Sequence, residues 1–580
     1  MNKRPKTSSG ERVHLSSSMD MSSASQLEQS KPLMEADVQF DSWAEKAMRN
    51  FIFEVGLGPR FVYLTSFKEM LQTVHNRDVE IPTYESMLRE ELKETQHRAM
   101  QLKQEWKKSG CSIIMDSWKS RCGTKSFISV LVHCSKGMYF LRSIDVSGIL
   151  EDMDELASVF SRVVDDVGAC NIVQVIRNDA SPHMRMAWHY VQKEHDHSFF
   201  VPPCADFCIN LLLEKIAAFD HVSEVLRKAK EITRFIYGNV LAYELVGRYI
   251  DDGEILSNSC LKSVAEFITL DRLVSVKENL VEMFSSPEWV SSDRSTRMFN
   301  PLDWISSGFS TTTSLFRHIC GIVKTDGAFW CAAADVLKIT KPFIDVLLKL
   351  ESEDCPMGIL YDTMASAKDI MHNLGDKYGD ILHWVDEIWY GYLHSPLHAA
   401  GHMLNPRVFY KDPSCDDPEL SGRIEACTTA IAKGHYDPGR LKAQIEVYKG
   451  RSGSFGSDSA IQQIVETPQV TVVWWSAHGT DTPELQSFAT RVLRQTCFGA
   501  KRYNISRQVS EEAHETRGAD LEELYRGLEY AHHNRRFASA APLIGGLSGD
   551  QCGKPGRKLG SDWFLYPRHR QHIVIGSSNT

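Results

Sequence analysis

Residues 111–118 read Cys-Ser-Ile-Ile-Met-Asp-Ser-Trp, a short apolar run with an aspartate near its end. Residues 127–134 and 138–146 have the same short, β-branched character, and the turn residues Gly123 and Ser135-Lys136-Gly137 separate the runs. Such runs with turn residues between them are typical of strands that follow one another in an antiparallel meander. The stretch therefore predicts three consecutive strands.

A change of period follows the third run. Apolar residues now recur at helical spacing, at Leu156, Val159, Phe160, Val163, Val164 and Val167. Gly168 ends this pattern, and residues 171–176 form another apolar run that indicates a buried strand. The predicted order is strand, strand, strand, helix, strand, followed by more helix. An RNase H-like fold has this order, with its first strand beside its fourth, and other α/β folds share it.

The composition of the whole chain is that of a globular protein, with 42% hydrophobic and 24% charged residues among 580. This length predicts several domains. Because the net charge is −10, binding to nucleic acid would need a local basic surface. The 14 cysteines show no framework spacing, which predicts reduced thiols, and no run approaches the roughly 20 apolar residues of a membrane helix. We therefore expect a soluble protein with no membrane partner.

Four strings along the chain carry more specific information. They are residues 111–118; residues 171–176, Asn-Ile-Val-Gln-Val-Ile; residues 395–406, Ser-Pro-Leu-His-Ala-Ala-Gly-His-Met-Leu-Asn-Pro; and residues 474–479, Trp-Trp-Ser-Ala-His-Gly, with Pro483-Glu484-Leu485 after them. In their order and separation these strings resemble plant-type hAT-superfamily transposases and their domesticated descendants. The resemblance extends from about Trp43 to Phe537.

The resemblance implies an α/β fold in which an RNase H-like core is interrupted by a large all-helical insertion. The predicted parts are a disordered tail at 1–40, a helical N-terminal subdomain at 41–110, the first part of the core at 111–225, the helical insertion at 226–440, the end of the core with the hAT dimerisation region at 441–540, and a poorly ordered tail at 541–580. The composition of the N-terminal tail, rich in Ser and Gln with few aromatics, agrees with disorder.

In the family, three carboxylates hold two divalent metal ions, which activate the attacking oxygen and neutralise the leaving one. Asp116 matches the first acid, although an aspartate at a strand end is also common in turns. At the second acid the chain has Asn178, within Arg177-Asn178-Asp179, and at the third it has Lys501. Asp179 is displaced by one residue, which turns its side chain to the opposite face at a strand end. Asp116 and Asp179 are thus expected to be degenerate remnants of the catalytic, metal-binding set.

Two further features of the family are altered in this chain. Phe207 stands where a Cys-x-x-His pattern has its histidine, which leaves Cys204 and Cys208 as too few ligands for tetrahedral zinc, so we expect buried thiols. No cysteine precedes Cys111, so the cysteine and histidine pairs of a BED-type zinc finger are missing.

The last helical pattern before residue 500 resembles the family's dimerisation segment. Its apolar residues form one stripe, which predicts burial either in the core or at a dimer interface. The residues expected to take part are Trp474, Trp475, Leu485, Phe488, Val492 and Leu493.

These observations lead to a hypothesis of a domesticated, catalytically inactive hAT transposase-like protein in the nucleus. We expect a homodimer or a hAT-type heterodimer that associates with DNA or chromatin, and Lys3, Arg4 and Lys6 form a candidate import patch. No cofactor and no small-molecule substrate are expected, and Mg²⁺ or Mn²⁺ would be needed only by an active site. Two alternatives stay open: a working or trans-complemented transposase that cleaves and transfers DNA strands, and a remnant without a selected function.

Overall fold

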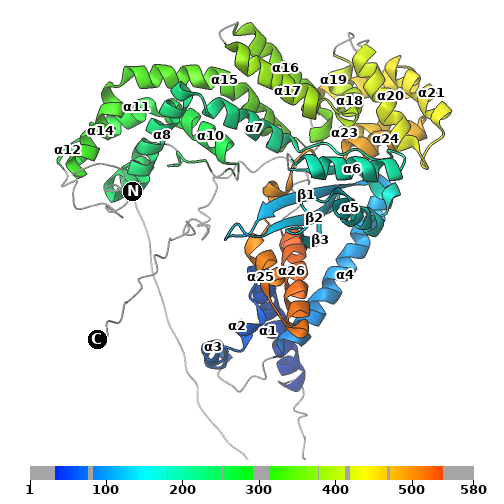
Figure 1. Ribbon diagram of the computed structural model, residues 1–580, viewed down its shortest axis with the longest axis horizontal. Helices are drawn as coiled ribbons and strands as arrows, with labels where there is room; N and C mark the ends of the chain where they lie inside the picture. The colour runs from blue at the N-terminus through cyan, green and yellow to red at the C-terminus, as the bar shows by residue number, and fades with distance from the viewer. Residues whose placement is uncertain are drawn as a thin grey trace, which may run out of the picture. The chain divides into compact units, whose positions relative to one another are not determined.

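The computed structural model describes the chain in segments that together hold every element discussed below (Figure 1). These are residues 33–75, 82–178, 181–250, 253–257, 259, 261–291, 312–353, 355–375, 378–411, 418–466, 471–503 and 505–539. Most of the two tails predicted to be disordered, at 1–40 and 541–580, lies outside the described residues. By its internal contacts the chain forms one compact unit through Ala540.

A four-stranded sheet lies at the centre of the fold, and its strands are those that the sequence predicts. Strands β1 (Cys111–Lys119), β2 (Ser126–Cys134) and β3 (Gly137–Asp145) form the antiparallel meander. Helix α5 (Met153–Val167) then leads to β4 (Ile172–Arg177). The strand order is β3-β2-β1-β4, so the predicted mixed α/β class is confirmed.

Strands β1 and β4 are parallel neighbours, as the sequence analysis requires. In their register Ile114 lies beside Ile176, and Met115 lies beside Arg177. Because both strands run in the same direction, Asp116 and Asn178 come to the same edge of the sheet. Isolated parallel bridges from Gln174 to Phe200 and from Arg177 to Pro203 continue the sheet beyond β4.

Each face of the sheet is covered by a different set of helices, because alternate residues along a strand point to opposite faces. Ile113 and Met115 pack in one apolar cluster with α5 and α6 (Pro182–Glu194). Ile114 packs in another, which includes Ala500 from the far end of the chain. On that second face Asn534 of α26 (Ala519–Ser539) donates to the Phe140 carbonyl oxygen at 2.9 Å and accepts from the Phe140 amide at 2.9 Å.

The N-terminal helices pack against the C-terminal ones, although most of the chain separates them (Figure 1). Their bounds are α1 (Leu33–Val55), α2 (Pro59–Val62), α3 (Thr65–His75) and α4 (Tyr84–Ser109). Glu91 of α4 is fully buried and forms ion pairs with Arg49 of α1 and with Arg535 of α26. A buried carboxylate is stable in an apolar interior only when it is paired, so these contacts fix the two ends of the chain together.

The described residues of 226–440 hold helices and no strand, as predicted. The helices from α7 onward are α7 (Ala205–Ala217), α8 (Asp220–Gly238), α9 (Val240–Tyr249), α10 (Lys262–Ser275), α11 (Lys277–Met283), α12 (Pro287–Ser291), α14 (Thr312–Thr325), α15 (Gly327–Ser352), α16 (Leu360–Asn373), α17 (Gly379–Ile388), α18 (Pro396–Met403), α19 (Pro406–Phe409), α20 (Pro418–Ala432) and α21 (Pro438–Lys449). In the described part of the chain, none of the helices has both the length and the apolar character that crossing a bilayer requires.

After this helical region the chain returns to the sheet. Helices α22 (Asp458–Glu466), α23 (Thr471–His478) and α24 (Pro483–Leu493) precede the return. Ser112 of β1 then donates to Gln495 Oε1 at 2.8 Å, and Gln174 of β4 donates to the Thr496 carbonyl oxygen at 2.6 Å. All of these polar side chains are buried, so their hydrogen bonds hold the returning segment over β1 and β4.

Candidate functional site at the ends of β1 and β4

Asp116 lies near the carboxyl end of β1 with only 2% of its surface exposed. The Nδ2 atom of Asn178, directly after β4, donates to Asp116 Oδ1 at 2.5 Å. Asn178 Oδ1 in turn accepts a hydrogen bond from the Ser117 amide at 2.8 Å. The Asn178 amide thus bridges the two strand ends, with its Nδ2 bonded to Asp116 and its Oδ1 bonded to the Ser117 amide.

Arg507, which was not among the predicted site residues, completes the surroundings of Asp116. It is the first residue of α25 (Arg507–Glu515), and its Nη2 atom lies 3.2 Å from Asp116 Oδ2. Its side chain is 45% exposed, and the guanidinium carbon is 5.9 Å from the centre of the Trp118 ring. Nothing in the sequence distinguishes this arginine from other helical arginines, because the contact depends on how α25 packs against the sheet.

Lys501 adds a second positive charge to this end of the sheet. It lies in the short 3-10 helix η6 (Ala500–Tyr503), and it is exposed. Burial raises the pKa of the Asp116 carboxyl, and Arg507, Asn178 and Lys501 all act in the opposite direction by stabilising the carboxylate. The one matched acid is therefore surrounded by an amide and two cationic side chains.

The other expected metal ligand, Asp179, lies outside the described residues. Arg177, at the end of β4, is buried, and its charge acts on the thiol of Cys208. The backbone at Arg177 pairs with the segment after α6, since its carbonyl oxygen accepts from the Cys204 amide at 3.0 Å. The structure therefore brings Asp116 and Asn178 together and places Lys501 close enough to act on Asp116.

The predicted buried thiols are confirmed. Cys204 and Cys208 are both free and buried, and burial raises the pKa of each thiol above its ordinary value. Next to them, Asp206 accepts a hydrogen bond from the Gly499 amide at 3.0 Å. A buried, protonated thiol is a poor metal ligand, so this pair serves to pack α7 against the returning segment.

The stripe assigned to dimerisation is buried, as predicted, and it is buried inside this chain. Its members are Trp474 at 2% exposure and Trp475, Leu485, Phe488, Val492 and Leu493 at 0%. The two indoles also donate to backbone within the same core, Trp474 Nε1 to the Ala460 carbonyl at 3.0 Å and Trp475 Nε1 to the Leu404 carbonyl at 2.8 Å. A dimer that keeps this core would use the surface around the stripe.

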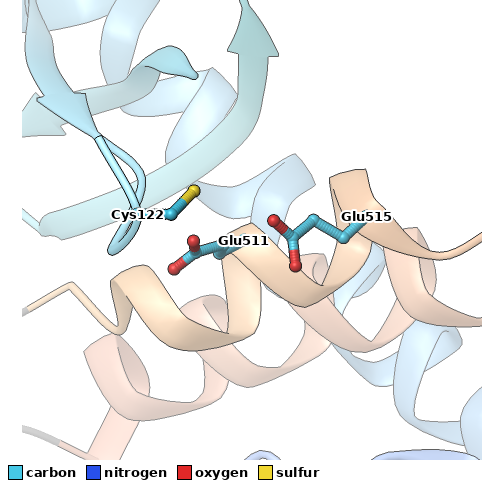
Figure 2. Close-up of side chains that lie close together, drawn as sticks. All are labelled: Cys122, Glu511 and Glu515. Carbon is cyan, nitrogen blue, oxygen red and sulfur yellow. The ribbon is translucent and has the colours of Figure 1, made fainter. Parts of the chain in front are cut away.

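A different group of side chains comes closest to a metal-ligand arrangement among the described residues. Cys122, in the turn between β1 and β2, faces Glu511 and Glu515 of α25, and one ligand atom from each lies within 4.8 Å of the others (Figure 2). Glu511 Oε1 also accepts from the Arg121 amide at 2.9 Å. One thiol and two carboxylates fall short of the four ligands of a structural zinc site. The group does not include Asp116.

The comparison with family models covers the part of the chain that holds the sheet. Residues 80–232 match the family described as Domain of unknown function (DUF659). A DUF659 domain is thus present, and the family is typical of plant hAT-like transposase proteins. The DUF659 domain includes β1 to β4, Asp116 and Asn178, while Lys501 and Arg507 come from outside it. The comparison with curated proteins found no match.

Proposed function

We propose that this chain is a domesticated, catalytically inactive hAT transposase-like protein that self-dimerises and associates with DNA or chromatin in the nucleus. The DUF659 domain supports the relation to hAT-type transposases. The other parts of the proposal rest on the arguments that follow.

An RNase H-like core is supported by the sheet order β3-β2-β1-β4, with the first strand parallel to the fourth. It is also supported by the return of the chain, after a long helical region, to the sheet face that α26 covers. In such a core the carboxylates that hold the metal ions gather at the ends of β1 and β4. The side chains around Asp116 therefore bear on whether this end of the sheet could hold metal ions.

The observation that carries the inactive assignment is the pairing of Asp116 with Arg507 and Asn178. A two-metal site needs several carboxylate oxygens facing one another, because hard divalent ions take oxygen ligands of negative charge. Here a guanidinium and an amide take up the oxygens of the single matched acid. Replacing a carboxylate by Lys501 changes the local charge by two units, so repulsion of a divalent cation outweighs what Asp116 contributes, even at an effective dielectric constant of about 20.

Dimerisation, DNA association and a nuclear location rest on the sequence. Residues 474–479 and 483–485 resemble the dimerisation segment of the family, and Lys3, Arg4 and Lys6 form the candidate import patch. With a net charge of −10, the chain needs a local cluster of arginines or lysines to hold a DNA phosphate backbone.

The test is a strand-cleavage assay with the full-length protein, Mg²⁺ or Mn²⁺, and DNA that carries hAT-type terminal repeats. We expect a mobility shift of the DNA and no cleavage, hairpin formation or strand transfer. The Asp116→Asn variant serves as the matched control, because it keeps the size of the side chain. Cleavage by the wild-type protein that is lost in Asp116→Asn would overturn the inactive assignment, and the absence of any DNA shift would overturn DNA association.

A further inference from the structure

A cavity of about 530 Å³ opens beside β3, which is the edge strand opposite β4 in the sheet. Residues of β3, α5, α25 and α26 line it, and Figure 1 shows β3 beside α26. Small-molecule sites typically enclose about 300–1,000 Å³, and the volume of this cavity falls within that range. It does not include Asp116 or any other residue of the remnant site.

Three arginines from three different elements line this cavity. They are Arg142 of β3, Arg162 of α5 and Arg526 of α26. Arg142 forms an ion pair with Asp166, and Arg526 lies 4.0 Å from Glu522. Burial and the charge of Arg162 together lower the pKa of Arg142, which shows that these two guanidiniums act on each other. This cluster of positively charged side chains is local, since the net charge of the whole chain is −10.

The acids of the cavity do not cancel this charge. Glu529 is buried, accepts a hydrogen bond from Ser143, and has a pKa raised to about 7 by burial, so much of it is uncharged at neutral pH. Asp145 is exposed and accepts from the Ser147 amide at 3.0 Å, and its hydrogen bonds from Ser147 outweigh the effect of burial and lower the pKa of its carboxyl, so it is charged at neutral pH. His514 Nε2 lies 2.8 Å from Ser143 Oγ, and burial lowers the pKa of its imidazole. The three guanidiniums therefore outnumber the charged acids of the lining.

The rest of the lining is apolar or aromatic. Among these residues Tyr530 and Ile144 are partly exposed, whereas Phe140 and Val159 are buried. The Tyr530 ring is held in place by Tyr139, with their hydroxyl oxygens 2.5 Å apart and their rings edge to face. Guanidiniums bind phosphate oxygens in a bidentate manner, and aromatic rings stack on nucleobases. The lining of the cavity contains both guanidiniums and an aromatic ring.

We propose that this cavity binds a phosphate ester of nucleotide size, with Arg142, Arg162 and Arg526 holding the phosphate and the Tyr530 side holding the sugar and base. This site goes beyond the proposed function, because it requires neither catalysis nor the remnant acids. The nucleotide is either free or part of a DNA strand, and these two sources share the same chemistry.

The test is calorimetric titration of the full-length protein with deoxyadenosine monophosphate, inorganic phosphate, and a short single-stranded oligonucleotide. The variants are Arg162→Gln and Arg526→Gln. The side chain of Arg162 is exposed and donates to the Ser158 carbonyl oxygen at 3.3 Å. Arg248→Gln, an exposed arginine of α9 that does not line the cavity, is the matched control. Thermal melts of each variant check folding, and Arg162→Lys tests whether charge alone restores binding.

We expect each cavity variant to weaken nucleotide binding on the order of tenfold, and Arg248→Gln to leave it unchanged. Binding of the mononucleotide identifies a free nucleotide as the ligand, while binding of the oligonucleotide alone identifies a nucleotide within a strand. In both cases, loss of that binding in the cavity variants supports the proposal. Equal binding by variants and control, no binding of either probe, or inorganic phosphate binding as tightly as the nucleotide would overturn it. If DNA binds equally well to the wild type and to these variants, the proposed DNA association still holds. If the mononucleotide binds and DNA does not, only the proposed DNA association is refuted.

Discussion

Arg507 and Asp116 lie 391 residues apart in the sequence, yet Arg507 Nη2 is 3.2 Å from Asp116 Oδ2. Asp116 is buried and Arg507 is about half exposed. Loss of the partner would therefore destabilise the charge of the buried carboxylate more than that of the arginine, which water can still solvate. The pair joins α25 to the end of β1. It also occupies the acid that a metal ion would need.

The first prediction concerns the stability of this pair. Arg507→Gln leaves the Asp116 charge buried with Asn178 and Lys501 to stabilise it. We expect a loss of about 1–2 kcal/mol in the free energy of unfolding, less than for a fully buried pair because water screens the arginine. Urea denaturation of the full chain measures it. In the double variant Asp116→Asn with Arg507→Gln most of the loss should disappear, whereas equal losses in the single and double variants would mean that the charge pair contributes nothing.

The second prediction concerns metal binding at the remnant site. Calorimetry with Mn²⁺ should find no tight site in the wild-type protein. Combining Lys501→Glu, Asn178→Asp and Arg177→Thr restores carboxylates and removes two positive charges, so binding should strengthen measurably, and adding Arg507→Ser should strengthen it further. If the wild-type protein binds two ions and Asp116→Ala abolishes both, the inactive assignment is wrong and Asp179 supplies the second ligand.

The third prediction concerns pH and Glu529. Its pKa rises from 4.5 to about 7 in the folded protein, so the folded state holds a proton that the unfolded state releases. Stability from this group is therefore present below about pH 4.5 and is lost as the pH rises through 7. Glu529→Gln keeps the uncharged form, and above pH 7 it should be more stable than wild type by about 3 kcal/mol.

Thermal melts between pH 5 and pH 8 measure this difference, which should grow with pH. Glu523→Gln changes an exposed carboxylate of the same helix and serves as the control. A Glu529→Gln difference that stays constant across the range would contradict the assignment of a buried acid that titrates near neutrality.

The fourth prediction separates core packing from dimerisation at α24. Leu485 is fully buried, so Leu485→Ala should cost about 2–5 kcal/mol, and the loss should not depend on protein concentration. Val473, in α23, is 52% exposed, and Val473→Ala should change stability by less than about 0.5 kcal/mol.

Light scattering of the wild-type protein then tests the dimer itself. A loss of stability in Leu485→Ala that becomes larger as the protein concentration rises would show that α24 contributes directly to an interface. Scattering that finds only monomer at micromolar concentration would remove the dimer from the proposal.

Local patterns in the sequence were sufficient to predict the framework of the fold. The three runs from residue 111 to 146 are strands β1 to β3 within one or two residues, and the apolar stripe from Leu156 to Val167 is α5. These predictions succeed because the alternation of strands and the period of helices are properties of neighbouring residues. The sequence also has Asn178 and Lys501 at the positions where the resemblance implies acids, and that prediction needs no structure.

Only the tertiary structure decided what surrounds these residues. Asp116 meets Arg507, and Arg142, Arg162 and Arg526 meet around one cavity, because helices from opposite ends of the chain pack on the same sheet. Likewise, the stripe at α24 was predicted to be buried in the core or at a dimer interface, and its residues are already fully buried within the single chain. Trp474 and Trp475 of α23 donate to Ala460 and Leu404 of the same chain. The sequence determines which side chains are apolar or charged, and packing between distant segments determines which of them meet, because no local period encodes a contact across hundreds of residues.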